Sequence, residues 1–186
     1  MPSKRGILLV QNVEVKMKNN VTVDVSGLES FKLDIIANNY CGAILPAALI
    51  EEDDGIKIVY QLEEYEPIPD YLRPVEAMEI IRDLIMLVAE LAYFMFTSFE
   101  YSLDIEDLYR NKRNSRLAAT LQVHNGDKEC ASMHKIISQV AERTNTYGQE
   151  MLHKLENEMS GKSIMVKDLV QIIDKKCEEI YQCDIQ

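Results

Sequence analysis

The most apolar stretch of the chain lies near its centre, at residues 80–96 (IIRDLIMLVAELAYFMF). Its apolar positions cover more than one stripe of a helix, which is typical of a helix buried on most sides. A membrane span needs about 20 mostly apolar residues, whereas Arg82, Asp83 and Glu90 interrupt this shorter run. A charge at bilayer depth costs on the order of 2.5 kcal/mol or more. We therefore predict a buried central helix over residues 74–96, opened by a proline, and no membrane span.

Upstream of this helix, alternating apolar and polar positions predict a small antiparallel sheet. The strands are predicted at residues 7–15, 21–25, 43–50 and 56–62. The first two form one predicted hairpin, and the last two form another around the turn Asp53-Asp54-Gly55. Between the hairpins, Ser30 is placed to cap a short helix over residues 31–39.

Downstream of the central helix, the pattern predicts one more hairpin and then three helices. The hairpin strands are residues 103–109 and 117–123, and the helices are residues 128–143, 147–159 and 164–181. The last helix has one broad apolar stripe, which either packs in the core or docks against a partner helix.

Pro67 and Pro69 interrupt regular structure and predict a hinge. The whole chain, residues 1–186, is therefore predicted to be one two-lobed α+β domain. Residues 1–66 form a sheet lobe with one helix, residues 67–74 the hinge, and residues 75–186 a mainly helical lobe that contains a β-hairpin.

Composition fits a globular protein and narrows the class of partner. The chain is 47% hydrophobic and 27% charged, with a formal net charge of -11. Nucleic acids and anionic membrane surfaces call for a basic footprint, so we expect neither as the main partner. Four cysteines without a C-x-x-C pair, and no signal peptide, favour free thiols and a cytoplasmic location.

The order of these elements resembles a shortened protein-kinase fold. More closely, the chain is similar to a family of kinase-like domains of unknown function that lie N-terminal to forkhead-associated domains in Gram-positive bacteria. The EssB/YukC pseudokinase family of type VII secretion is a more distant likeness. The stretches that carry the resemblance are Ala43-Ile44-Leu45-Pro46, Ile56-Lys57-Ile58-Val59-Tyr60 and Leu103-Asp104-Ile105-Glu106-Asp107-Leu108-Tyr109.

The residues that phosphoryl transfer needs are missing where this resemblance places them. The first predicted turn reads Lys18-Asn19-Asn20 instead of a glycine-rich loop, and residues 21–25 (VTVDV) contain no lysine. No H-R-D precedes residue 103, and no D-F-G follows the predicted hairpin at residues 103–123. The resemblance therefore implies a pseudokinase without ATP chemistry, without catalytic residues, and without a bound metal or other cofactor.

One basic cluster stands out in this acidic chain. Arg110, Lys112, Arg113 and Arg116 all lie on the predicted hairpin at residues 103–123. Guanidinium groups bind phosphate with two parallel hydrogen bonds, so the cluster is a candidate binding site for an acidic or phosphorylated protein segment. The alternative interpretation is a solvated hairpin tip.

Other chemical signals have simpler interpretations. Carboxylates at positions 100, 104, 106 and 107 could bind a metal or act as a base, but a solvated turn explains them without a partner lysine, histidine or glycine loop. Gly161-Lys162-Ser163 lacks the upstream glycine of a phosphate-binding loop, and Ser163 fits a helix cap. His124, His134 and His153 lack metal-ligand spacing.

We therefore expect a non-catalytic interaction or regulatory module of a bacterial signalling or secretion assembly, with a protein partner or a second copy of the chain. Two alternatives stay open. One is a small-molecule or nucleotide sensor with a cleft between the lobes near residues 60–65. The other is an enzyme with a carboxylate or thiol site, for which Asp104 and Cys41 are the candidates.

Overall fold

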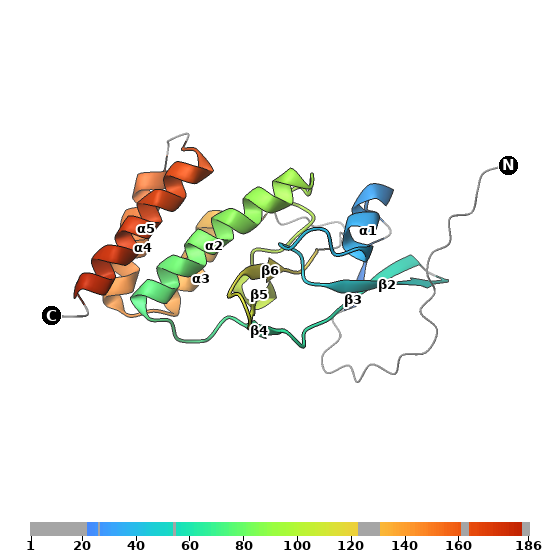
Figure 1. Cartoon of the computed structure of the whole chain (residues 1–186), viewed down its shortest axis with the longest axis horizontal. Coiled ribbons are helices and arrows are strands. Elements are labelled where there is room, and N and C mark those ends of the chain that lie inside the picture. Colours follow the sequence, from blue (N-terminus) through green and yellow to red (C-terminus); the bar gives the residue numbers. More distant parts are fainter. Residues whose placement is uncertain (1–21, 26, 54, 123–130, 161–163, 184–186) are drawn as a thin grey trace.

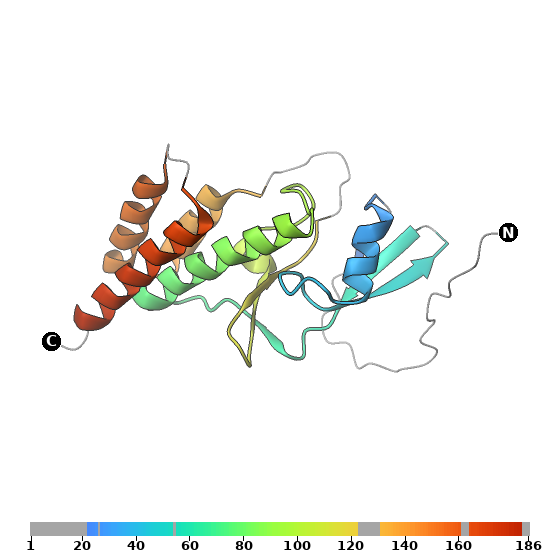
Figure 2. The same ribbon diagram turned by 45° about the horizontal axis from the view of Figure 1, so that its top comes forward.

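The computed structural model describes residues 22–25, 27–53, 55–122, 131–160 and 164–183. This part of the chain is α+β, with five α-helices and two three-stranded antiparallel sheets. The first sheet and α1 occupy one end of the molecule, helices α2 to α5 occupy the other, and the second sheet lies between them (Figure 1). The same order is visible in the turned view of Figure 2. The predicted α+β class is confirmed.

The first sheet has the strand order β1-β3-β2, where β1 is Thr22–Asp24, β2 is Ala47–Glu52 and β3 is Gly55–Tyr60. Strands β2 and β3 form the predicted hairpin, with Glu52 opposite Gly55. Gly55 has a φ of 146°, a backbone conformation that residues with a side chain rarely adopt, which explains the glycine. The predicted strand at residues 7–15 lies outside the described residues.

Helix α1, Ser30–Ala37, packs against β2 and buries Lys32 and Ile36. The helix was predicted, but the prediction that Ser30 caps it was wrong. Glu29 is the N-cap, because its carbonyl oxygen already accepts hydrogen bonds from the Lys32 and Leu33 amides. Ser30 is consequently the first residue inside the helix.

The second sheet has the order β4-β5-β6, with β4 at Tyr65–Pro67, β5 at Leu108–Asn111 and β6 at Leu117–Ala119. Strands β5 and β6 are the hairpin expected from the sequence. Pro67, expected to interrupt regular structure, ends an edge strand that pairs with β5, a position where a missing N–H does no harm. Ile105–Asp107, expected in a strand, is a 3₁₀ helix (η1) capped by the Asp104 side chain.

Four helices follow β4 along the chain: α2 (Pro74–Tyr93), α3 (Met133–Glu142), α4 (Thr146–Met159) and α5 (Val166–Cys183). They agree with the predicted helices apart from their ends. Helix α2 packs against α3, α4, α5 and β6, and its exposed residues are Met86, Ala92 and Tyr93. It is therefore buried on most sides, as predicted. In the described residues, no helix has the length and apolarity to cross a membrane.

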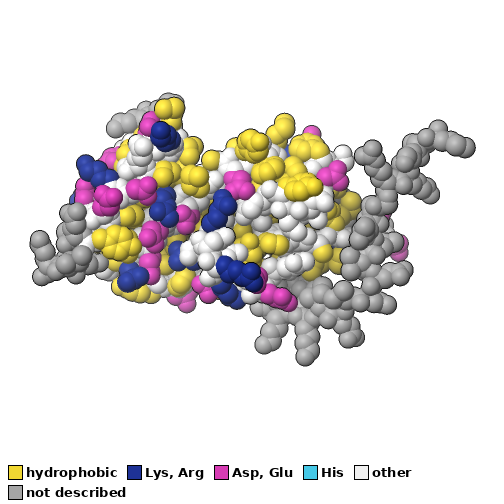
Figure 3. Space-filling view, viewed as in Figure 1, with side chains coloured by type: hydrophobic (Ala, Val, Ile, Leu, Met, Phe, Trp, Pro, Cys, Tyr) yellow, Lys and Arg dark blue, Asp and Glu magenta, His cyan; other side chains and the backbone are white. Residues whose placement is uncertain are grey.

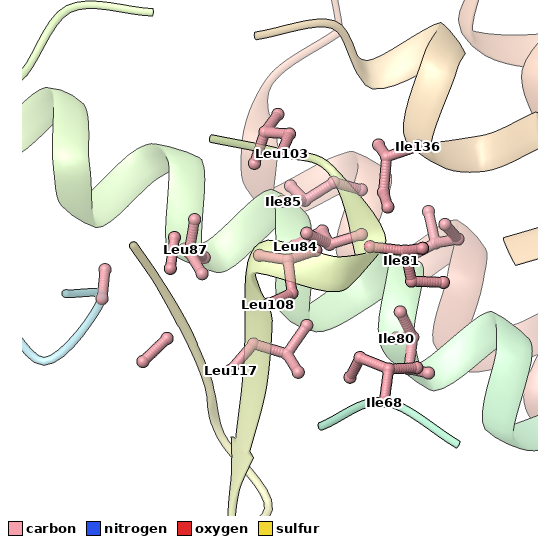
Figure 4. Close-up of a cluster of buried hydrophobic side chains, with 14 of the residues drawn as sticks. Ile68, Ile80, Ile81, Leu84, Ile85, Leu87, Leu103, Leu108, Leu117 and Ile136 are labelled. Carbon is pink, nitrogen blue, oxygen red and sulfur yellow. The ribbon is translucent and has the colours of Figure 1, made fainter. Parts of the chain in front are cut away.

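The stripe of α5 is part of the core. Leu169, Ile173, Cys177 and Ile180 are all buried, and α5 packs along α2. Figure 4 shows the other side of α2, where Ile81 and Leu84 point toward Leu108 of the hairpin and Ile136 of α3. All four of these side chains are completely buried. We call β1–β3 with α1 the sheet lobe, and β4–β6 with α2–α5 the helical lobe.

We expect Leu84→Ala to lower the free energy of unfolding by about 2–5 kcal/mol, because it leaves a cavity beside a side chain that is 0% exposed. Met86→Ala is the matched control on the same helix, because Met86 is 47% exposed, and it should change stability by no more than about 0.5 kcal/mol. Urea denaturation followed by circular dichroism measures both. Equal losses for the two variants would contradict the placement of α2.

Candidate functional site

The two lobes meet through backbone pairing and one buried tyrosine. The Ala119 amide donates to the Ala43 carbonyl at 2.9 Å, and the Leu45 amide donates to the Ala119 carbonyl at 3.1 Å. The segment before β2 thereby forms one parallel β-bridge with β6, between Ile44 and Ala119. Nearby, the Tyr60 hydroxyl of β3 accepts a 2.7 Å hydrogen bond from the Leu121 amide. Burial raises the pKa of Tyr60, against the opposing effect of the Leu121 hydrogen bond, so the phenol stays protonated.

A buried ion pair joins the lobes a short distance away. The Lys32 Nζ atom of α1 lies 2.8 Å from Glu100 Oε1 and 2.9 Å from Glu100 Oε2, in the loop that follows α2. The side chains are 4% and 15% exposed. Glu29 adds a second carboxylate at 3.1 Å from the Lys32 Nζ atom. A charge this deeply buried is stable only when paired, so the position of α1 depends on this contact.

Two aromatic rings enclose the ammonium group. The Lys32 Nζ atom lies 5.6 Å from the centroid of the Phe31 ring and 5.7 Å from that of the Phe96 ring. Both distances are within the range of a cation–π interaction. Glu100 is held in turn by the amide of Thr97 at 2.7 Å and its hydroxyl at 3.1 Å. The carboxylate is thus held by its own loop as well as by Lys32.

The ionisation of this pair is stabilised at neutral pH. Burial acts to lower the pKa of Lys32, but hydrogen bonds and charges from Glu100 and Glu29 outweigh it and raise that pKa above its usual 10.5. Burial acts to raise the pKa of Glu100, but hydrogen bonds from Lys32 and Thr97 bring that pKa below its usual 4.5. Both groups are therefore charged across the physiological range.

Glu90 of α2 makes another contact between the lobes. Its carboxylate accepts a 2.7 Å hydrogen bond from the Gly42 amide and a 3.0 Å hydrogen bond from Arg116 Nη2. One helix side chain thereby links the segment before β2 with the start of β6. The lobe junction is held by these polar contacts and by the backbone pairing at Ala119.

Three of the four carboxylates predicted as one cluster have separate structural partners, and the fourth, Asp107, lines the same cavity as Asp104. Asp104 caps η1 and accepts a 3.1 Å hydrogen bond from Gln139 Nε2. Glu106 pairs with Arg143 of the helical lobe, and Glu100 pairs with Lys32. In the part of the chain that the structure describes, no group of three histidine, cysteine or acidic residues is arranged to hold a metal ion.

A polar cavity of about 250 Å³ lies beside Asp104. Ser102, Asp107, Gln122, Ser132 and Lys135 supply its polar lining. The Lys135 Nζ atom lies 3.4 Å from Asp104 Oδ2, so the cavity contains a paired charge. Burial acts to raise the pKa of Asp104, but hydrogen bonds from Gln139, Glu106 and Lys135 and the charge of Lys135 lower it overall. Asp104 is thus anionic at neutral pH and lacks the raised pKa of a general acid.

The predicted basic cluster lies on the β5–β6 hairpin and makes internal contacts. Arg113 pairs with Glu64, and Lys112 Nζ donates to the Glu63 carbonyl oxygen at 2.8 Å. Arg116 pairs with Glu90. The Arg110 Nε atom is buried without a hydrogen-bond partner among the described residues. The Arg113 and Arg116 side chains remain 77% and 63% exposed, so solvent reaches both guanidinium groups.

The thiols that the structure describes are buried and free. Burial raises the pKa of Cys41 and the pKa of Cys177 to about 11, which keeps both thiols protonated at neutral pH. Thiolate is the nucleophilic form of cysteine, so neither residue is set up for nucleophilic catalysis. Cys130 and Cys183 lie outside the residues whose side chains are described, as do His124 and Ser163.

Sequence reasoning missed Lys32 as the central residue of the junction. The available signal was its position four residues before Ile36, which places both on one face of the predicted helix. A lone lysine on an apolar helical face predicts either that its ammonium group reaches solvent or that it is buried in an ion pair. The second case applies here because Glu100, 68 residues away in the sequence, supplies the carboxylate.

Comparisons of this chain with models of known protein families, with curated proteins and with solved structures find no match. The functional argument therefore depends on the geometry of the chain itself.

We expect Glu100→Gln to lower the free energy of unfolding by about 3 kcal/mol, because it leaves the Lys32 ammonium group buried beside a neutral amide. The double variant Lys32→Met/Glu100→Gln should be more stable than Glu100→Gln alone, since it removes the orphaned charge. Chemical denaturation measures both.

The same pair predicts a pH dependence. Glu100 has a lowered pKa in the folded state, so its contribution is present above its usual pKa of 4.5 and is lost as the pH falls through the folded value. The stability difference between the wild-type chain and Glu100→Gln should therefore shrink below that pH. A difference that stays constant from neutral to acidic pH would contradict the ion pair.

Proposed function

We propose that this chain is a non-catalytic, kinase-like module that binds a protein partner in a bacterial signalling or secretion assembly. The observation that carries the proposal is the Lys32–Glu100 ion pair. In an active kinase, a lysine of the sheet pairs with a glutamate of the helix packed on it and contacts the nucleotide phosphates. Here the helix packed on the sheet carries the lysine, and the glutamate belongs to the other lobe. The charge pair thus has a structural role, joining the lobes.

The carboxylates near the junction support the same proposal. Magnesium in a kinase needs carboxylate oxygens that are free to coordinate it. Glu100 and Glu106 are each in ion pairs, and Asp104 caps η1 and contacts Gln139 and Lys135. Recruiting any of them to a metal would break a contact that holds one part of the fold to another. A scaffold built in this way favours binding to partners over phosphoryl transfer.

The β5–β6 hairpin is the surface that we propose for an acidic or phosphorylated partner segment. Arg110, Lys112, Arg113 and Arg116 lie on this hairpin or at its ends. The Arg113–Glu64 ion pair is largely exposed on both sides, and such pairs are worth only about 0–1 kcal/mol each. A phosphate that binds the Arg113 guanidinium group with two hydrogen bonds can therefore displace Glu64.

A small polar ligand is the second candidate, favoured by the cavity beside Asp104. Its volume of about 250 Å³ is below the roughly 300–1,000 Å³ of typical ligand sites, and a nucleotide with its triphosphate would not fit inside. A small polar metabolite would. The cavity therefore favours a sensor of small molecules over a nucleotide sensor.

We expect no change in melting temperature when ATP and magnesium are added. A ligand at 100 times its dissociation constant stabilises the native state by about 2.7 kcal/mol, which would raise the melting temperature by about 2–8 °C. Differential scanning fluorimetry resolves such a shift. A magnesium-dependent rise would show that the chain binds the nucleotide, and would favour a nucleotide sensor over the partner-binding module proposed above.

We expect the double variant Lys112→Glu/Arg113→Glu to bind a fluorescein-labelled phosphoserine peptide at least about tenfold more weakly than the wild-type chain. Fluorescence anisotropy measures the affinity, and the unphosphorylated peptide is the ligand control. The variant Lys154→Glu/Lys175→Glu is the charge-matched control, because both lysines are exposed and lie on α4 and α5, away from the hairpin. Equal weakening by both variants would mean that net charge, and not the hairpin, governs binding.

A further inference from the structure

The C-terminal end of α2 places a cluster of apolar side chains in solvent. Tyr93 is 81% exposed, Met95 66% and Phe99 41%. Phe31 of α1, at 39%, belongs to the same surface, because the Lys32 ammonium group lies against both its ring and that of Phe96. We call these four residues the aromatic–methionine surface. In Figure 3, hydrophobic side chains gather over α1 and this end of α2.

Met95 is held in a conformation that its residue type disfavours. The Phe96 amide donates to the Leu91 carbonyl and the Met95 amide donates to the Ala92 carbonyl, which together are the Schellman pattern at a helix end. The residue at the centre of this pattern is usually glycine, because it takes a positive φ. Met95 takes it with a φ of 64°. The fold thus accepts a strained backbone at the residue whose side chain is largely in water.

Single exposed apolar residues are ordinary on a protein surface, but Tyr93, Met95 and Phe99 are three exposed apolar residues within seven positions at the end of one helix. Leu91 and Phe96, the pair that a Schellman end normally packs together, are both buried, so the core of the turn is complete without the Met95 side chain. Tyrosine, phenylalanine and methionine are the residue types enriched at the centres of protein interfaces. Methionine also adapts its shape to varied partners. These features point to a docking surface.

The charges around the surface indicate what covers it. Within residues 27–42 and 86–102, Lys32 is the one lysine or arginine, and it is 3% exposed and paired. The same segments carry carboxylates at Glu29, which is 66% exposed, and at Asp34, which is also exposed. The surface is thus apolar at its centre and acidic at its edge. In a two-fold symmetric dimer, a second copy of this chain would present this same surface, so acidic edge would meet acidic edge.

We propose that the aromatic–methionine surface binds a basic amphipathic helix of a partner protein. The apolar face of that helix would cover Tyr93, Met95, Phe99 and Phe31, and its lysines or arginines would lie against Glu29 and Asp34. In this kind of binding, a row of apolar residues on the partner helix packs on an exposed hydrophobic surface, and complementary charges set the orientation of the helix. The inference names a partner class for the interaction role proposed above and rests on that role.

The test uses the whole chain and a labelled model peptide of leucine and lysine, amphipathic and about five helical turns long. The ligand controls are a leucine–glutamate peptide of the same pattern and a leucine–lysine peptide of scrambled order. We expect fluorescence anisotropy to show binding of the basic amphipathic peptide alone. Absence of this binding, or equal binding of either control peptide, would overturn the proposal.

Met95→Gly is the decisive variant. Glycine suits the positive φ, so the melting temperature should stay the same or rise, while the peptide affinity should fall at least about tenfold. Tyr93→Ala should weaken binding as well, and it keeps the test valid if the glycine variant alters the helix end. Met165→Gly and Tyr71→Ala are the matched controls, because these residues are 69% and 63% exposed elsewhere on the fold.

Unchanged binding in Met95→Gly and Tyr93→Ala, or equal losses in the controls, would overturn the proposal. A dimer in sedimentation equilibrium that Met95→Gly abolishes would also overturn it, because a second copy would then be the occupant. Stabilisation by ATP and magnesium would favour a nucleotide sensor over the interaction role proposed above, and would leave the peptide result as it stands. The two failures are therefore distinguishable.

Discussion

The burial of α2 is the constraint on which the rest of the structure depends. An apolar helix that is not in a membrane has to be covered by other elements, and three helices and a β-strand cover this one. Loss of water from its side chains is worth roughly 25 cal/mol per Å² of apolar surface, the dominant favourable term in folding. The second sheet lies beside α2 for this reason, and the polar contacts of the lobe junction are arranged around its C-terminal end.

The lobe junction illustrates how a polar contact can decide an arrangement that apolar burial leaves open. Apolar packing is non-directional, so it would tolerate α1 in several positions over β2. The Lys32–Glu100 pair is directional, and an unpaired partner would be costly at this depth. Together with Glu90 and the backbone pairing at Ala119, it holds the two lobes in one orientation. This favours a rigid scaffold over a pair of lobes that close around a substrate.

Two surfaces of opposite charge follow from this arrangement. The β5–β6 hairpin projects guanidinium groups, and the Arg113–Glu64 ion pair is weak because water reaches both partners. The end of α2 projects apolar side chains with carboxylates at the edge. If both surfaces bind as proposed, the chain would engage two parts of a partner, or two partners, at once. The strained backbone at Met95 fits this interpretation, since strain in a fold often accompanies binding sites.

The local elements could be predicted from the sequence, whereas their contacts could not. Alternation of apolar and polar residues, together with the turn residues that include Gly55, predicts the β2–β3 hairpin. The helical period predicts α2 to α5. Both signals are local, because the residues that carry them lie within a few positions of one another. The pairing of β4 with β5, which places Pro67 at a sheet edge, joins residues about 40 positions apart and leaves no local trace. The basic hairpin was visible in the sequence, but its internal partners Glu64 and Glu90 were not.

The sequence by itself thus determined the α+β class, the buried central helix and the β2–β3 and β5–β6 hairpins, since periodicity and glycine or proline positions act locally. The tertiary structure alone decided that Lys32 is buried against Glu100, that the acidic residues at 100, 104 and 106 have separate partners, and that Met95 lies in solvent with a positive φ. Each of these depends on which distant segments meet, and that is set by how the whole chain covers α2.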